Sequence, residues 1–260
     1  MPHSQKRGSV MRRDLIIRLR LLDDAMPSAF RSYVRQIYRG LRQKLLRPRW
    51  GNLCRSGPFR DSSEPGYGTP IDHLYFAEFI DTNLDAIRGR VLEVGNRLWV
   101  DRAAAGQVTS VDVLDIDPNN LQATILGEPS DLLVLDQSSY DCVIMTRPVG
   151  YPSDPAVILE TLWSALKPGG AILLSSPVIG PTNLENPDGW RFTTLGLQML
   201  VERAIPAAQV SVCDFGSLAT AIASIAGIPA EWVRKPALSW RDRRFPVVAC
   251  ARINRPAIGP

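Results

Sequence analysis

The stretch that decides the fold is Arg90–Gly95, RVLEVG, an apolar run that ends in an acid and then a glycine. Such a run is typical of a short buried strand. Glycine lets the chain turn tightly at the strand end and lets a ligand approach the backbone. The next acid expected at a strand end is Asp112, 17 residues after Gly95. A carboxylate at about that spacing commonly binds ribose hydroxyls, although Glu93 and Asp112 could equally be solvated strand ends.

Outward from this strand, apolar strands alternate with amphipathic helices. The expected strands span 90–95, 108–114, 122–126, 141–146, 171–176, 210–215 and 246–253, and the expected helices span 71–87, 156–166, 193–204 and 218–226. This alternation predicts an α/β fold with a mostly parallel, seven-stranded, Rossmann-like sheet, helices on both faces and an antiparallel last strand. In such sheets the ligand binds outside the carboxyl ends of the strands.

The scarcity of glycine after the first strand narrows the choice of cofactor. Gly95 is followed by Asn96-Arg97-Leu98-Trp99, without the further glycines of a loop that cradles phosphates. The chain also has no G-x-x-x-x-G-K-[ST] motif. These features disfavour a dinucleotide such as NAD and a nucleoside triphosphate. They favour a cofactor with adenine and ribose but no pyrophosphate, and S-adenosylmethionine fits that description.

The order of these segments resembles class I S-adenosylmethionine-dependent methyltransferases over about residues 66–253, including the LKPGG turn at 166–170. More narrowly, GTPIDHLYFAEFI at 68–80 and GWRFTTLGLQMLVE at 189–202 resemble a bacterial subfamily associated with glycosyltransferases and the synthesis of polysaccharides or glycosylated metabolites. The resemblance implies the methyltransferase fold and S-adenosylmethionine as cofactor. Together with the strand-end pattern it makes six residues candidate cofactor ligands: Tyr75, Glu93, Gly95, Asn96, Asp112 and Glu128.

His73 is the candidate general base. It is the only histidine apart from His3 near the N-terminus, and histidine is the side chain best suited to accept a proton near neutral pH. The resemblance places His73 on the helix beside the cofactor cleft. The alternative is a helix-face histidine bonded to a neighbour.

Four residues are candidate acceptor ligands. Trp190 and Arg191 offer an aromatic face and a planar cation to a sugar ring or an anionic acceptor; otherwise they pack on the core and form a surface ion pair. Arg147 and Tyr151 follow the fourth strand, where this fold holds its acceptors. Arg147 could equally brace a nearby aspartate.

Charge divides the chain into two parts. Residues 1–60 hold 15 Lys and Arg and three acids, whereas residues 61–260 hold 15 Lys and Arg and 23 acids. We therefore predict a basic helical N-terminal extension and linker over 1–60 and an S-adenosylmethionine-binding methyltransferase domain over 61–260. The basic helix face is open to three interpretations: a solvated surface, docking on anionic lipid headgroups, or contact with a protein partner or the domain's own acidic surface. Nucleic acid is not expected, because no recognised nucleic-acid-binding motif appears.

Several classes of protein are disfavoured. No stretch approaches the ~20 apolar residues that span a bilayer, and no secretory cleavage site follows the first apolar run. No metal is expected, because the aspartates at 112, 115 and 117 have no histidine beside them. The four cysteines are widely separated and form neither a C-x-x-C pair nor the pattern of a disulfide framework: Cys54, Cys142, Cys213 and Cys250. This spacing predicts a reducing, cytoplasmic compartment.

The leading functional hypothesis is methyl transfer from S-adenosylmethionine to an oxygen, in preference to a nitrogen, of a small molecule such as a sugar or glycosylated metabolite. The alternative is a methyltransferase-fold protein that binds the cofactor but is non-catalytic or repurposed. The segments at 127–129 and 147–151 favour the alternative, because they depart from the subfamily pattern. The sequence leaves open whether the protein is a homo-oligomer.

Overall fold

The computed structural model describes residues 53, 56–59, 68–146, 154–182 and 189–257. The chain divides into two units, Met1–Arg55 and Ser56–Pro260, and the described residues lie almost entirely in the second. The domain boundary predicted at residue 60 falls outside the described residues, and so does nearly all of the predicted basic extension. Both stay predictions.

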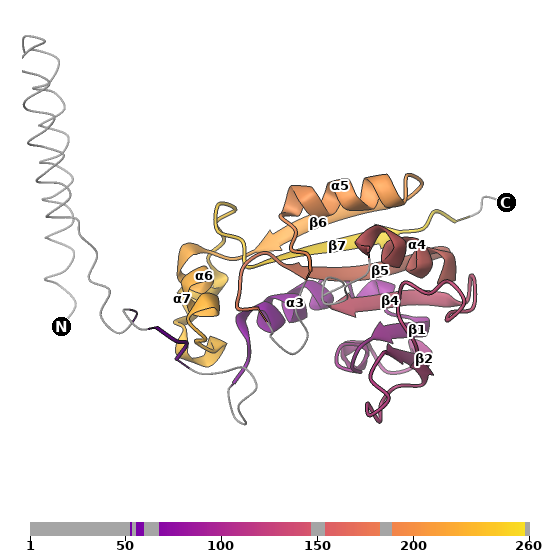
Figure 1. Ribbon diagram of the computed structural model, residues 1–260, viewed down its shortest axis with the longest axis horizontal. Coiled ribbons are helices and arrows are strands. Elements are labelled where there is room, and N and C mark those ends of the chain that lie inside the picture. The colour runs from indigo at the N-terminus through magenta and orange to yellow at the C-terminus, as the bar shows by residue number, and fades with distance from the viewer. Residues whose placement is uncertain (1–52, 54–55, 60–67, 147–153, 183–188, 258–260) are drawn as a thin grey trace, which may run out of the picture. The chain divides into compact units, whose positions relative to one another are not determined.

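The described part of the second unit contains one seven-stranded sheet in the order β3-β2-β1-β4-β5-β7-β6 (Figure 1). Strands β1 to β5 run parallel, and β7 lies antiparallel between β5 and β6. The predicted α/β fold, with a mostly parallel sheet and an antiparallel last strand, is confirmed. The strands are β1 Gly89–Val94, β2 Val108–Asp115, β3 Ile125–Leu126, β4 Tyr140–Thr146, β5 Leu166–Pro177, β6 Gln209–Phe215 and β7 Val248–Asn254.

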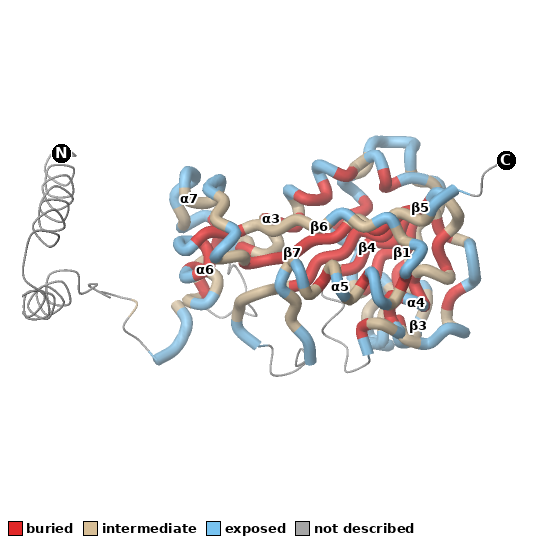
Figure 2. The backbone as a smooth tube through the Cα atoms, turned by 90° about the horizontal axis from the view of Figure 1, so that it is seen from above, coloured by how far each residue is buried: buried red, intermediate tan, exposed pale blue. Residues whose placement is uncertain are grey.

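Helices cover both faces of the sheet. One face carries α3 (Ile71–Asp81), α6 (Leu218–Ile225) and α7 (Lys235–Ser239); the other carries α4 (Pro155–Ala165) and α5 (Thr194–Ala204). The strands serve both layers because their side chains alternate: Cys142 and Ile144 of β4 pack with α3, and Val143 and Met145 pack with α4. Figure 2 shows the buried residues concentrated along the central strands.

Helix α3 is shorter than the predicted helix over 71–87. It buries one side, with Ile71, Tyr75 and Phe79 at helical spacing. It ends at Asp81 because the side chains of Thr82 and Asn83 both donate hydrogen bonds to the carbonyl of Phe79, at 2.8 Å each. Such side-chain bonds to the backbone compete with a further helical turn, and the chain continues as a short 3-10 turn, Leu84–Ala86.

The connections around β1, β2 and β3 are short. Between β1 and β2 the described residues form only a 3-10 turn, Val100–Arg102, and no helix lies between β2 and β3. No helix in the described part of the chain is long and apolar enough to cross a membrane.

Candidate functional site

The carboxyl end of β1 presents an open stretch of backbone. Gly95, the residue after β1, has a φ angle of +96°, a conformation that side chains disfavour. A side-chain carbon placed on Gly95 would meet nothing within 4 Å. Glycine is therefore needed here for the backbone conformation, and the space beside it is open to a ligand.

Strand β2 ends directly beside Gly95. The amide of Gly95 donates to the carbonyl of Leu114 at 2.8 Å, so Asp115 is the strand-end acid at this edge. Asn120 joins the two strand ends: its side-chain amide donates to the carbonyl of Gly95 at 2.9 Å and to the Asp115 carboxylate at 2.5 Å. The same amide lies 3.4 Å from the side-chain oxygen of Asn96. Neither Asp115 as the strand-end acid nor Asn120 as the residue that positions it was predicted from the sequence.

The end of β3 brings Glu128 to the same edge. Gly127 donates its amide hydrogen to the carbonyl of Asp115 at 3.0 Å, and the exposed Glu128 follows it. Gly127 must be small because any side chain there would collide with Val134. Gly95, Asp115 and Glu128 therefore meet at one edge, although they lie far apart in the sequence.

The expected position of Asp112 is wrong. It lies inside β2, opposite Leu92 and three residues before the strand ends. Its carboxylate accepts hydrogen bonds from Arg90 Nε at 2.9 Å and from the Tyr140 hydroxyl at 3.1 Å, and it forms an ion pair with Arg90 Nη2 at 2.8 Å. Asp112 thus links β2 to Arg90 of β1 and to Tyr140 of β4, and it does not lie at the end of the strand.

The carboxylate of Glu93 is also engaged in hydrogen bonds within the protein. Its side chain is buried, and its carboxylate accepts the amides of Leu98, Trp99 and Val100 at 2.7, 2.8 and 3.2 Å. Burial raises the pKa of Glu93, while these three hydrogen bonds lower it, and burial prevails. Glu93 therefore holds the loop after β1 in place, which is the geometry expected of a support for a ligand site.

The expected contact between Tyr75 and a cofactor is contradicted by the structure. Tyr75 is fully buried, its ring stacks on Phe215 at a centroid distance of 5.8 Å, and its hydroxyl donates to the carbonyl of Leu238 at 3.0 Å. Burial raises the pKa of this phenol. Position 75 faces inward because it belongs to the buried side of α3, so Tyr75 is a core residue.

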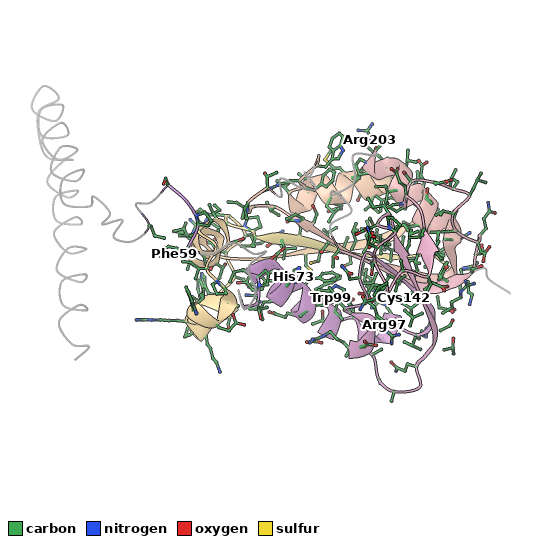
Figure 3. All side chains as sticks on the ribbon, turned by 60° about the horizontal axis from the view of Figure 1, so that its bottom comes forward. Phe59, His73, Arg97, Trp99, Cys142 and Arg203 are labelled. Atoms are coloured by element: carbon green, nitrogen blue, oxygen red, sulfur yellow. The ribbon has the colours of Figure 1, made fainter. Side chains whose placement is uncertain are left out.

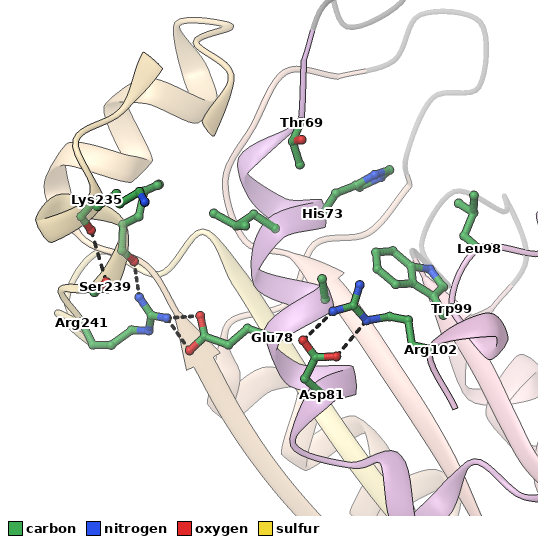
Figure 4. A pocket seen from close by; sticks show the side chains of 13 residues that line it. Thr69, His73, Glu78, Asp81, Leu98, Trp99, Arg102, Lys235, Ser239 and Arg241 are labelled. Atoms are coloured by element: carbon green, nitrogen blue, oxygen red, sulfur yellow. Dashed lines mark hydrogen bonds and ion pairs between the residues drawn. The ribbon is translucent and has the colours of Figure 1, made fainter. Parts of the chain in front are cut away.

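An open cavity of about 950 Å³, here called the α3 trough, runs along the exposed side of α3 (Figure 4). Ion pairs line it, at 2.5 Å each: Arg102 with Asp81, and Arg241 with Glu78. The other lining side chains mix polar and apolar groups from α3, the loop after β1 and α7: Thr69, His73, Leu74, Ala77, Leu98, Trp99, Lys235, Leu238 and Ser239. The trough does not extend over Gly95, Asp115 or Glu128.

His73 stands where the α3 trough meets the carboxyl edge of the sheet. It lines the trough and also a second cavity of about 10 Å³ beside Thr146 and Pro177, the last residues of β4 and β5. Its ring meets Trp99 edge-on at a centroid distance of 6.0 Å (Figure 3). The histidine is half-buried and does not point into the core.

Trp99 carries the one buried side-chain nitrogen or oxygen among the described residues that has no hydrogen-bond partner, its indole Nε1. Its ring packs edge-on against Phe76 at 4.9 Å. Figure 4 shows the indole nitrogen turned toward Leu98 at the rim of the α3 trough. Buried donors are nearly always paired, so this unmet N–H is an exception among the described side chains.

The four candidate acceptor ligands are only partly visible. Arg147 and Tyr151 lie outside the described residues. Trp190 is exposed and stacks on Phe192 with the ring planes 3° apart. Arg191 donates to the carbonyls of Gly180 and Pro181 at 2.6 and 3.1 Å, which fastens the chain after β5. The structure therefore gives Arg191 a positioning role, and Trp190 remains 46% exposed beside Phe192.

No family model matches the chain, and no curated protein matches its sequence. Many solved structures match its fold. A chain from the complex of the Haloferax volcanii Trm112 methyltransferase activator with a protein assigned as a methyltransferase has 18% identity and a TM-score of 0.50, over 73% of this chain and 92% of that one. This chain has the class I methyltransferase fold.

Two further neighbours are S-adenosylmethionine-dependent methyltransferases. One, from Archaeoglobus fulgidus, has 14% identity and a TM-score of 0.47, over 70% of this chain and 94% of that one. The other, from Mesorhizobium loti, has 16% identity and a TM-score of 0.46, over 68% and 96%. At such identities the likeness concerns the fold alone, and the activity must be argued from the site.

Proposed function

We propose that this protein transfers a methyl group from S-adenosylmethionine to a hydroxyl of a small acceptor. The observation that carries the proposal is the meeting of Gly95, Asp115 and Glu128 at the carboxyl edge of a methyltransferase-type sheet. Ligands of open α/β sheets bind at that edge.

The residues at this edge suit S-adenosylmethionine. Asp115 takes the role first expected of Asp112 and accepts hydrogen bonds from the ribose hydroxyls, while Glu128 accepts from the adenine amino group. The open backbone at Gly95 and Asn96 lies against the amino-acid part. When bound, this cofactor supplies a methyl group on a positively charged sulfur. Carboxylates are appropriate partners for such a ligand, because it presents hydroxyl and amino donors together with positive charge.

The acceptor lies in the α3 trough with its reactive hydroxyl at His73. A cavity of about 950 Å³ is at the upper end of the size range of small-molecule sites. The apolar stretch at Leu74, Ala77 and Leu98 covers the body of the acceptor. An imidazole nitrogen of His73 takes the hydroxyl proton as the oxygen gains its methyl group. Holding the acceptor in line contributes most of the rate enhancement.

A sugar or glycosylated metabolite is the acceptor class we propose. The support is the resemblance of segments 68–80 and 189–202 to the glycosyltransferase-associated subfamily, together with the exposed face of Trp190. A ring face of this kind suits stacking on a sugar. Arg147 and Tyr151 remain proposed acceptor ligands, and we place the reaction in the cytoplasm.

The direct test is calorimetry with S-adenosylhomocysteine and with NAD. Stabilisation and binding by the first compound alone supports the proposal, whereas binding of NAD alone overturns it. A methyl-transfer assay with hydroxylated sugars then tests the reaction. The variant for this assay is His73→Gln, which removes the imidazole but keeps a polar side chain of similar size on α3.

The second candidate is a methyltransferase-fold protein that binds the cofactor without catalysis. The observation in its favour is the loop after β1, where Arg97 and Trp99 stand in place of further glycines. In addition, the Glu93 carboxylate already accepts hydrogen bonds from three backbone amides. Tight binding of S-adenosylhomocysteine together with no turnover on any hydroxylated acceptor would favour this candidate.

A further inference from the structure

The outer side of α6 carries an apolar stripe. Leu218, Ile222 and Ile225 are 51%, 36% and 52% exposed, and their spacing of four and three residues places them on one side of the helix. The opposite side, with Thr220 and Ala223, is buried in the core. Helix α6 therefore presents large aliphatic side chains to solvent, where small or polar residues would suffice for folding.

Two exposed tryptophans belong to the same end of the domain. Trp232 is 59% exposed and Trp240 is 66% exposed, whereas tryptophan is usually highly buried. Trp232 ends the 3-10 turn that follows α6, and Trp240 directly follows α7. Figure 1 shows α6 and α7 together at one end of the sheet. We call these five residues the α6–α7 patch: Leu218, Ile222, Ile225, Trp232 and Trp240.

The α6–α7 patch lies in a basic segment of an acidic domain. Residues 216–246 contain five Lys and Arg and two acids, although residues 61–260 as a whole hold more acids than bases. Arg243 and Arg244 expose 87% and 80% of their side chains, although they pair with Asp214 and Asp242 at 3.8 and 2.6 Å. Arg234 and Lys235, which lie between the two tryptophans in the sequence, are also exposed. Clustered positive charge beside exposed apolar groups attracts an anionic surface.

The residue types in the α6–α7 patch indicate whether it binds a membrane or a second copy of the chain. Tryptophan favours the interface between water and lipid, aliphatic side chains insert beneath it, and Lys and Arg bind anionic headgroups. A symmetric dimer would bring the same basic segment of both copies together, and like charges would oppose it. The patch therefore fits an anionic bilayer better than a second copy of the chain.

The path of the chain adds a second argument. The amide of Phe59 donates to the carbonyl of Ala226 at 2.8 Å, which fixes the chain beside the C-terminal end of α6. The residues before it form the most basic part of the sequence, with 15 Lys and Arg and three acids in residues 1–60. Stable peripheral binding usually requires two signals, such as an inserted apolar group and a polybasic segment.

We propose that the α6–α7 patch docks the protein on an anionic membrane surface. The aliphatic stripe and the tryptophans enter the headgroup region, and the surrounding Lys and Arg side chains contact the lipid phosphates. This proposal is independent of the reaction that the protein catalyses.

The test is co-sedimentation of the full chain with vesicles of phosphatidylcholine, alone or mixed equally with phosphatidylglycerol. Wild type should bind the mixed vesicles, and added salt should weaken binding because it screens the charges. The double variant I222S/I225S should bind roughly tenfold or more weakly, since two inserted aliphatic side chains are lost. The matched control is L195S/M199S, two exposed apolar residues one turn apart on α5, and it should bind as wild type does.

Three results would overturn the proposal: I222S/I225S binding like wild type, wild type failing to bind the mixed vesicles, or the patch variant altering self-association instead of vesicle binding. A second measurement does not depend on the serine variants. Lipids with brominated acyl chains should quench the tryptophan fluorescence of wild type, and W232F/W240F should lose most of that quenching. Equal quenching in both proteins would place other tryptophans at the membrane and refute the assignment.

Discussion

Exchanging Asp115 and Asp112 for asparagine, one at a time, separates ligand binding from sheet stability. Both residues belong to β2, three positions apart, and both substitutions remove one negative charge and keep the side-chain shape. Asp115 stands beside Gly95 at the strand end, whereas Asp112 is engaged by Arg90 and Tyr140 inside the sheet. We expect Asp115→Asn to weaken cofactor binding and Asp112→Asn to lower stability.

The magnitudes follow from the contacts. In Asp115→Asn the remaining carbonyl oxygen still accepts from Asn120, but the two charge-assisted hydrogen bonds to ribose are weakened. A loss of about 1.5–3 kcal/mol corresponds to roughly 10- to 100-fold in Kd. In Asp112→Asn the ion pair with Arg90 is lost, but the arginine side chain is 35% exposed and partly screened. We therefore expect about 1–2 kcal/mol of destabilisation.

Titration calorimetry with S-adenosylhomocysteine measures the affinity, and urea denaturation of the ligand-free proteins measures the stability. The reasoning is refuted if Asp112→Asn weakens binding and Asp115→Asn does not, because the ribose acid would then lie inside β2. If both variants bind as tightly as wild type, β2 does not hold the cofactor at all.

Four further outcomes are expected. His73→Gln should lower turnover by roughly 10²- to 10⁴-fold with cofactor affinity nearly unchanged; steady-state kinetics and calorimetry check both. Trp99→Phe removes the unpaired N–H, so the free energy of unfolding should change by no more than about 1 kcal/mol despite the lost ring area, and a loss above about 3 kcal/mol would show that the nitrogen is satisfied. Gly127→Ala should destabilise by roughly 1–3 kcal/mol because its side chain meets Val134, as thermal denaturation will report. Burial raises the pKa of Tyr140 to about 12, so stability should be complete below pH 10 and decline as the pH rises toward 12; an unchanged pH dependence in Tyr140→Phe would contradict this.

The strands could be predicted from the sequence because each is a short apolar run bounded by turn residues, as at Arg90–Gly95. Their ends could not. The expected second strand stopped at Leu114, but pairing with β1 and β3 extends it to Asp115. The acid at the end of the strand is therefore Asp115 and not Asp112. The strand end could not be read from the local sequence because it is decided by hydrogen bonding to the neighbouring strands.

Helix α3 shows a second feature that could not be predicted from the sequence, namely which of its side chains are buried in the core. Its apolar spacing identified the helix correctly, but spacing alone does not tell which of its aromatic residues line a site and which are core. Tyr75 was expected at the cofactor, yet β6, α7 and the chain after α7 close over it through Phe215, Leu238 and Arg241, respectively. Helix α7 itself was not predicted, because its five residues show no periodic pattern and depend on packing against the rest of the domain.

The loop after β1 explains which ligands this edge of the sheet can take. In a glycine-rich loop the backbone N–H groups point outward and hold a phosphate. Here the amides of Leu98, Trp99 and Val100 turn inward to the buried carboxylate of Glu93, so they have no hydrogen left for an external anion. The two carboxylates at the edge, Asp115 and Glu128, are acceptors. Two carboxylates at this edge favour a ligand that presents hydroxyl donors, amino donors and positive charge, which supports the S-adenosylmethionine site that we propose.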